Sequence, residues 1–120
     1  KPMKPIEIAD VQAYLDTFEN KPVYIHLETT NGAYAHHVDE KAVNAGAFIR
    51  NAKVVYTRGR ITGDNGTYRV GLKLDSGWIY TEGLTDWTVT DAGELLLAGH
   101  DQEGRLFVAL QISERPFRYE

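Results

Sequence analysis

The chain has 120 residues, of which 13 are Lys or Arg and 17 are Asp or Glu, so its formal net charge is −4 with histidine neutral. This length suits one domain of common size and excludes a second full domain. An acidic chain lacks the overall positive field of a general nucleic-acid binder, so nucleic acid is not an expected partner.

Other features of the composition narrow the class further. The chain has no cysteine, which excludes thiol nucleophiles, iron–sulfur clusters, Cys-ligated zinc and disulfides. No apolar run approaches the roughly 18 residues that a membrane-spanning helix needs, and the first residues lack the apolar segment of a secretory signal. We therefore expect a single cytoplasmic, mainly β domain over residues 1–120 that does not bind a membrane.

The N-terminal part of the chain predicts one amphipathic helix. Residues 1–6 include two prolines and are expected to be extended. Over residues 7–20, apolar side chains recur at steps of three and four, which is the period of a helix with one buried face. They are Ile8, Val11, Leu15 and Phe18. Pro22 follows closely and ends the pattern, because proline has no backbone N–H to donate.

After Pro22 the period changes from helical to two, which indicates a strand over residues 23–28. Asn31-Gly32 then predicts a two-residue hairpin loop, since these residues tolerate the positive φ angles of such a turn. In that register Glu28 lies opposite Ala35, and His26 lies opposite His37. Residues 39–46 are expected to form a loop or a short helical turn.

The rest of the chain predicts a series of short strands. They cover residues 53–62, 68–74, 78–81, 85–90, 95–100 and 105–113, and clusters of Gly, Asp, Asn and Ser separate most of them. The last two are apolar on both faces, which is typical of strands inside a layered core. The predicted fold is a distorted antiparallel β-sandwich or partly open barrel of about eight short strands with one N-terminal α-helix.

The first candidate site is a metal site on the predicted hairpin, formed by His26, Glu28 and His37. Side chains on one face of paired strands lie about 5–8 Å apart, so two imidazoles and a carboxylate could meet at one ion. Two histidines and one carboxylate hold Zn(II) or Fe(II) and leave coordination positions open for water or substrate. The alternative is that these residues only supply the polar face of a half-exposed hairpin.

The second candidate site is a basic face. The segment from residue 53 to residue 74 alternates, so that one face is apolar and the other carries Tyr56 and the cations Arg58, Arg60, Arg69 and Lys73. Guanidinium groups form paired hydrogen bonds to carboxylates and phosphates, so this face could bind an anionic metabolite or an acidic protein surface. The alternative is a solvated face that prevents edge-to-edge pairing of sheets.

The third candidate site is aromatic and consists of Trp78, Tyr80 and Trp87. Glu82 and Asp86 stand between these rings, and exposed rings beside carboxylates are typical of a sugar-binding cleft; two carboxylates about 5–9 Å apart would also suit glycoside hydrolysis. The alternative is that the rings fill the interior of a small β domain. A further hypothesis is that the protein is a structural homo-oligomer, such as a homodimer, with Trp78 and Trp87 at its interface.

Several catalytic signatures are absent from the sequence. Ser76 and Ser113 are its serines, and neither stands in G-x-S-x-G, so acyl-enzyme catalysis is not expected. The sequence also lacks a P-loop and a dinucleotide-binding fingerprint, which excludes nucleotide-driven chemistry.

Four blocks of sequence carry a family resemblance. They are H-L-E-T-T-N-G-A-Y-A at residues 26–35, G-A-F-I-R-N at 46–51, Y-R-V-G-L-K at 68–73 and L-L-L-A-G-H-D at 95–101. Together they resemble the YojF family of small proteins from bacilli and their relatives. The resemblance implies a mainly β, distorted-sandwich fold and carries no established functional residues. Genes of that family often neighbour a deacetylase of the kind that acts in bacillithiol synthesis, which implies a role near that pathway.

From these observations we expect a non-catalytic binding or accessory module without a cofactor. Its predicted working surface is the basic face, and its expected partner is an anionic metabolite or a deacetylase-type enzyme. The alternative is a small metal-dependent enzyme that uses the two histidines and Glu28 to hold zinc or iron.

Overall fold

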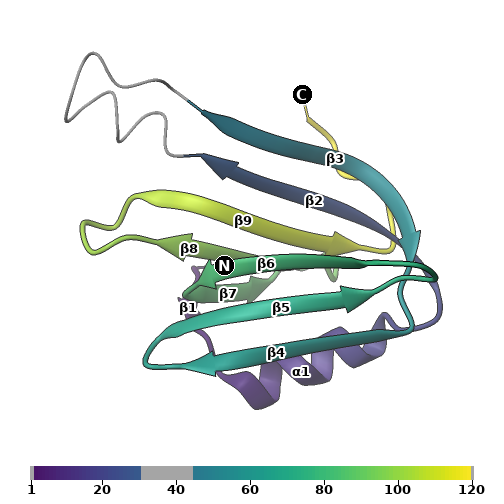
Figure 1. Cartoon of the computed structure of the whole chain (residues 1–120), viewed down its shortest axis with the longest axis horizontal. Coiled ribbons are helices and arrows are strands. Elements are labelled where there is room, and N and C mark those ends of the chain that lie inside the picture. Colours follow the sequence, from purple (N-terminus) through teal and green to yellow (C-terminus); the bar gives the residue numbers. More distant parts are fainter. Residues whose placement is uncertain (1, 31–44, 120) are drawn as a thin grey trace.

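The computed structural model describes residues 2–30 and 45–119, which form one helix and nine strands (Figure 1). In chain order they are β1 (Lys4–Pro5), α1 (Ile8–Thr17), β2 (Pro22–Thr30), β3 (Gly46–Val55), β4 (Arg58–Asp64), β5 (Thr67–Lys73), β6 (Trp78–Leu84), β7 (Asp86–Val89), β8 (Leu95–His100) and β9 (Leu106–Ser113). Among the described residues, no helix is both long and apolar enough to cross a membrane.

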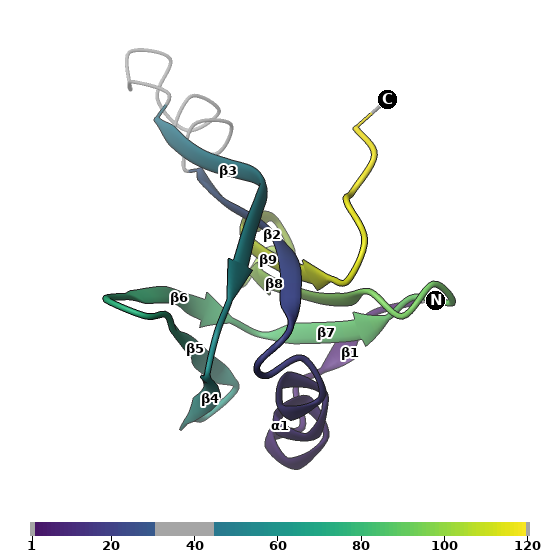
Figure 2. The same cartoon turned by 90° about the vertical axis from the view of Figure 1, so that its right-hand side faces the viewer.

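The strands form two antiparallel sheets. The larger sheet has the order β1-β7-β8-β9-β2-β3, and the smaller sheet has the order β4-β5-β6. Figure 2 shows the smaller sheet extending to one side of the larger one, with α1 below them. The predicted antiparallel, sandwich-like β fold is confirmed, and within the described ranges the sheets do not close into a barrel.

The core lies where α1 and the two sheets meet. Val11 and Leu15 of α1 and Phe18 just after it are buried, as the helical period predicted, whereas Ile8, the first residue of the helix, is 40% exposed. β8 and β9 lie inside the larger sheet and contribute further fully or almost fully buried side chains, namely Leu95, Leu97, Leu110 and Ile112. The apolar C-terminal hairpin is therefore part of the core, as its sequence indicated.

The predicted strand over residues 53–62 is wrong, because the chain changes sheets within it. β3 ends at Val55 in the larger sheet, and β4 begins at Arg58 in the smaller one. The predicted parity is also reversed at the crossing, where Val55 is 46% exposed and Tyr56 is fully buried. Alternation of residue types continues across the break, so the pattern alone gives no sign that the backbone turns there.

The predicted register after Asn31-Gly32 is also wrong. Glu28 lies opposite Phe48 of β3 on one side and opposite Ala109 of β9 on the other, so both of its neighbouring strands come from elsewhere in the chain. The predicted loop residues themselves, and most of residues 39–46, lie outside the described residues.

α1 covers the outer edge of β4 through polar side chains. Gln12 donates from Nε2 to the Gly59 carbonyl at 2.8 Å, and its Oε1 accepts from the Ile61 backbone N–H at 3.1 Å. Glu19 accepts from the Gly59 backbone N–H at 3.2 Å. These bonds satisfy backbone groups of an edge strand that would otherwise invite pairing with another chain.

Tyr56 joins the crossing segment to the end of α1. Its hydroxyl donates to the Leu15 carbonyl at 2.6 Å, in the last turn of the helix where carbonyl groups lack partners within the helix. Burial raises the pKa of the Tyr56 phenol well above its ordinary value, and the carboxylates of Glu19 and Asp16 raise this pKa further.

Candidate functional site

The register of β4 and β5 places the four predicted cations on one face of the smaller sheet. Arg58 lies directly opposite Lys73, Arg60 lies opposite Gly71, and Arg69 lies opposite Thr62. The intervening residues point the other way, and Ile61, Val70 and Leu72 are buried in the core. The shared basic face that the alternation predicted is therefore present.

β6 extends two rows of this face with another side chain. Trp78 lies opposite Lys73, and Tyr80 lies opposite Gly71. The two rings are 44% and 49% exposed, and they stack with centroids 5.4 Å apart at an interplanar angle of 10°. The cationic and aromatic candidates thus form a single surface. We call it the basic-aromatic face, made of Arg58, Arg60, Arg69, Lys73, Trp78 and Tyr80.

Gly71 allows the aromatic pair to lean over the middle strand of the sheet. A Cβ atom at this position would stand 2.9 Å from Cε1 of Tyr80 and 3.6 Å from Cε3 of Trp78. Any larger residue would push the Tyr80 ring away from the strand. The glycine therefore determines the position of the stacked rings, and an aromatic side chain covering a strand glycine also protects the backbone there.

The cations of this face differ in their partners. Nη1 of Arg60 lies 3.9 Å from the Asp16 carboxylate in α1 and 3.7 Å from the Glu19 carboxylate just after this helix. Arg69 lies 3.8 Å from the Glu82 carboxylate, and its guanidinium stacks 4.4 Å from the Tyr80 ring centroid. Within residues 2–30 and 45–119, no carboxylate forms an ion pair with Arg58 or Lys73.

Trp87 does not belong to this surface, contrary to its grouping with the other two rings. It lies in β7 of the larger sheet and is 5% exposed. Tyr14 packs against it at 6.1 Å between centroids, and the Lys4 ammonium lies 4.9 Å from its ring. Trp87 therefore fills the interior, and it cannot form an exposed oligomer interface together with Trp78.

The two carboxylates between the aromatic residues are held by different sheets. Glu82 is on β6 and pairs with Arg69, whereas Asp86 is on β7 and lies 3.1 Å from Nδ1 of His100. Thr85 also donates to the Asp86 carboxylate at 2.5 Å. Each carboxylate therefore has its own local partners, and the arrangement does not favour a shared site for glycoside hydrolysis.

Two of the hairpin candidates, His26 and Glu28, lie on β2 in a partly buried hydrogen-bond chain. His26 is 4% exposed; its Nε2 lies 2.8 Å from Oε1 of Glu28 and its Nδ1 lies 3.0 Å from the Tyr119 hydroxyl. Because the carboxylate accepts, Nε2 carries the proton and the phenol donates to Nδ1 in neutral His26. Both ring nitrogens thus have protein partners.

The predicted metal site stays a prediction. His37, its third member, lies outside the described residues. In the part of the chain that the structure describes, no group of three or more His, Cys, Asp or Glu side chains is placed to hold a metal ion.

The C-terminal tail covers His26, and no pattern in the sequence indicated this contact. Phe117 packs edge-on against the His26 ring at 6.4 Å, and Tyr119 lies 5.5 Å from it. Asn51 fixes this tail by donating to the Phe117 carbonyl at 2.9 Å and accepting from its N–H at 2.8 Å. A contact between residues 93 positions apart follows from tertiary packing, which local patterns do not encode.

Comparison with known proteins places the chain in a family. A family described as "Protein of unknown function (DUF1806)" matches residues 5–117. The "Uncharacterized protein YojF" of Bacillus subtilis (strain 168) is 56% identical over 115 residues, which cover 96% of this chain and 98% of the relative. The chain belongs to the YojF family.

The solved fold agrees with this assignment. The crystal structure of the Bacillus subtilis YojF protein matches with a TM-score of 0.82 and 47% sequence identity, covering 99% of this chain and 100% of that one. The resemblance to the YojF family seen in the sequence is therefore confirmed. Membership of this family does not by itself assign a ligand or a reaction, because these depend on the residues of a site.

Proposed function

We propose that the protein is a non-catalytic accessory module that binds an acidic surface of a partner protein through the basic-aromatic face. The observation that carries this proposal is the row formed by Arg58, Lys73 and Trp78 across three strands. Two like charges directly opposite each other destabilise a strand pair, and here no ion-pair partner among the described residues offsets them. A carboxylate from outside the chain would relieve that repulsion.

The composition of the face favours a protein over a small anion. Trp, Tyr and Arg are the side chains that most often dominate binding energy at protein interfaces. Small-molecule sites, in contrast, are concave and enclose most of the ligand. The groove beside β6 is lined by none of the four cations. We therefore propose a protein partner, and the experiment below also shows whether an anionic metabolite binds the same cations instead.

A second copy of the chain fits this face poorly. A symmetric dimer brings the same surface patch of each subunit together, so the face would meet itself. Arg58 and Lys73 would then approach the identical cations of the other subunit. The face therefore favours a partner of opposite charge, and a homodimer formed elsewhere on the molecule stays a separate prediction.

The first partner to test is a deacetylase-type enzyme encoded beside a gene of this family, as the family resemblance implied. Calorimetric titration in 50 mM and 300 mM NaCl should show binding that weakens by at least about tenfold at the higher salt. Acrylamide should quench Trp78 fluorescence less in the complex, while Trp87 is already buried. Trp78→Ala should lower the affinity, whereas Arg118→Glu, an exposed charge change away from the face, should matter less.

Titration of the free protein with malate, phosphate and a sugar phosphate forms the second arm. Binding of these anions without binding of the enzyme would replace the protein partner by a metabolite. Absence of binding in both arms, or binding of the enzyme that does not respond to salt and leaves Trp78 accessible, would contradict the proposal.

A further inference from the structure

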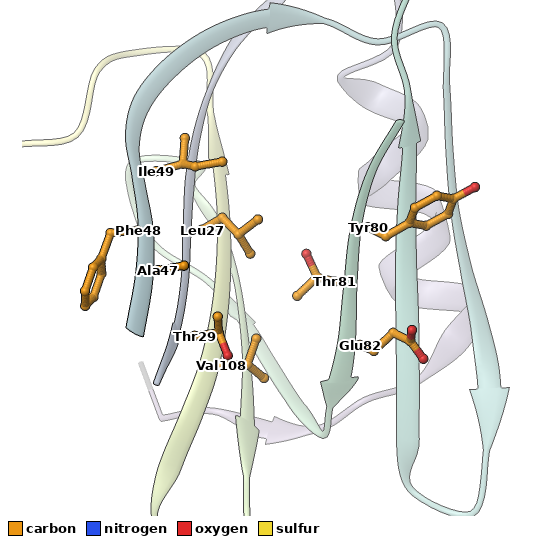
Figure 3. A pocket seen from close by; sticks show the side chains of 9 residues that line it. All are labelled: Leu27, Thr29, Ala47, Phe48, Ile49, Tyr80, Thr81, Glu82 and Val108. Atoms are coloured by element: carbon orange, nitrogen blue, oxygen red, sulfur yellow. The ribbon is translucent and has the colours of Figure 1, made fainter. Parts of the chain in front are cut away.

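A groove lies between β6 and the larger sheet, and Tyr80 of the basic-aromatic face is among the residues that line it (Figure 3). Its volume is about 380 Å³, within the usual range for small-molecule sites. Its walls come from β2, β3, β6 and β9, and its lining includes Leu27, Thr29, Ile49, Thr81 and Val108. Figure 3 shows the side chains of Leu27 and Thr81 between the two walls, whereas Tyr80 and Glu82 point away from the groove.

Thr81 is the unusual residue of this groove. It is 3% exposed, and its hydroxyl has no hydrogen-bond partner among the described residues. A buried hydroxyl without a partner loses its bonds to water and gains nothing in return, which destabilises the protein. Leu27, Ile49 and Val108 offer it no donor or acceptor side chain. The Thr81 oxygen has less than 1 Å² of accessible surface, so the side chain has to rotate about χ1 to turn its hydroxyl into the groove. After this rotation, a ligand in the groove that carries a hydrogen-bonding group would complete the site.

The lining also indicates the charge of such a ligand. None of the described residues that line the groove is a Lys, Arg or His, so they offer an anion no counter-charge. Glu82 is the carboxylate among these described lining residues, and it pairs with Arg69, so it offers little to a cation. We infer that the groove binds a small uncharged amphipathic molecule, whose apolar body contacts Leu27, Ile49 and Val108 and whose hydroxyl or carbonyl group bonds to Thr81.

The test uses 1-hexanol and 1-chlorohexane, which have the same chain length but differ in the polar group. Titration of the full chain, followed through the methyl resonances of its Leu, Ile and Val residues, should shift Leu27, Ile49 and Val108. The control is Leu106, which is 49% exposed in β9 and does not line the groove. 1-Hexanol should bind about threefold to tenfold more tightly than 1-chlorohexane, the range expected for one net hydrogen bond.

Two variants separate the role of the hydroxyl from that of packing. Thr81→Val keeps the shape of the side chain and should reduce the affinity for 1-hexanol to that for 1-chlorohexane, while raising the melting temperature of the free protein. Thr81→Ser keeps the hydroxyl, and it should retain the preference for 1-hexanol. Equal shifts at Leu106 and in the groove would show unspecific partitioning and overturn the inference. An unchanged preference in Thr81→Val, or its loss in Thr81→Ser, would equally overturn it.

Discussion

Lys73→Glu should make the protein more stable, although it changes a residue of the proposed binding surface. The substitution places a carboxylate directly opposite Arg58 and beside Trp78. With the charged groups about 7 Å apart, the present repulsion is about 0.6 kcal/mol in water. Reversing one charge turns this repulsion into an attraction of similar size, so the free energy of unfolding should rise by about 1 kcal/mol at low ionic strength.

Urea denaturation of Lys73→Glu and of the parent protein measures this difference. Arg118→Glu is the matched control, since it changes the net charge equally at an exposed position outside the strand pair. The gain should fall to about a tenth in 1 M NaCl, where the screening length is about 3 Å. A loss of stability in Lys73→Glu, or the same gain in Arg118→Glu, would refute the argument that Arg58 and Lys73 repel each other.

Four further substitutions test other parts of the structure. Above about pH 10 the phenol of Tyr56 ionises in the unfolded chain, whereas in the folded protein its raised pKa keeps the proton on. This difference lowers the free energy of unfolding by up to about 1.4 kcal/mol per pH unit. Tyr56→Phe should abolish this loss, which urea denaturation across alkaline pH measures. Asn51→Gly should remove both bonds to Phe117 and make trypsin cleave the C-terminal tail about tenfold faster. Gly71→Ala should mainly shift the flexible Tyr80 ring and change the near-ultraviolet circular dichroism, whereas Gly99→Ala should cost more than about 2 kcal/mol because its Cβ would meet the Gly83 carbonyl oxygen at 2.2 Å.

Each of these expectations has an outcome that contradicts it. An alkaline stability profile shared by the parent and Tyr56→Phe would mean that this phenol ionises normally in the folded protein. Unchanged tryptic cleavage in Asn51→Gly would mean that the tail is held by other contacts. Gly71→Ala and Gly99→Ala should differ, because the new Cβ meets a flexible side chain in the first and backbone in the second. Equal destabilisation by the two substitutions would contradict this expectation.

The basic half of the proposed surface could be predicted from the sequence because a period of two is a local property. Once Arg58, Arg60, Arg69 and Lys73 stand at alternate positions of strands joined by a short turn, they share a face in any register that keeps the parity. The same reasoning predicted the buried face of α1 from its period of 3.6.

The joining of the aromatic and basic groups could not be predicted in this way. It depends on the register between β5 and β6, which sets Trp78 beside Lys73 and is shifted by an irregularity between Tyr68 and Val70. The burial of Trp87 depends on which face of which sheet it occupies, and a pattern of alternating residues does not determine that choice.

Long-range packing explains the remaining differences. The crossing at Tyr56 is stabilised by its bond to Leu15, 41 positions away, and the cover over His26 comes from the far end of the chain. The unpartnered hydroxyl of Thr81 has no sequence signal either, because threonine is common in strands and only its surroundings make it unusual.

The most direct test of the account is the affinity of the double variant Arg58→Glu/Lys73→Glu for the deacetylase-type partner, measured by calorimetry in 50 mM NaCl. The matched control is Lys53→Glu/Arg118→Glu, which changes the net charge equally at exposed positions off the basic-aromatic face. We predict at least about a thirtyfold loss of affinity for the first variant and less than about a threefold loss for the control. Equal losses in both variants, or full affinity in the first, would contradict the claim that this face is the binding surface.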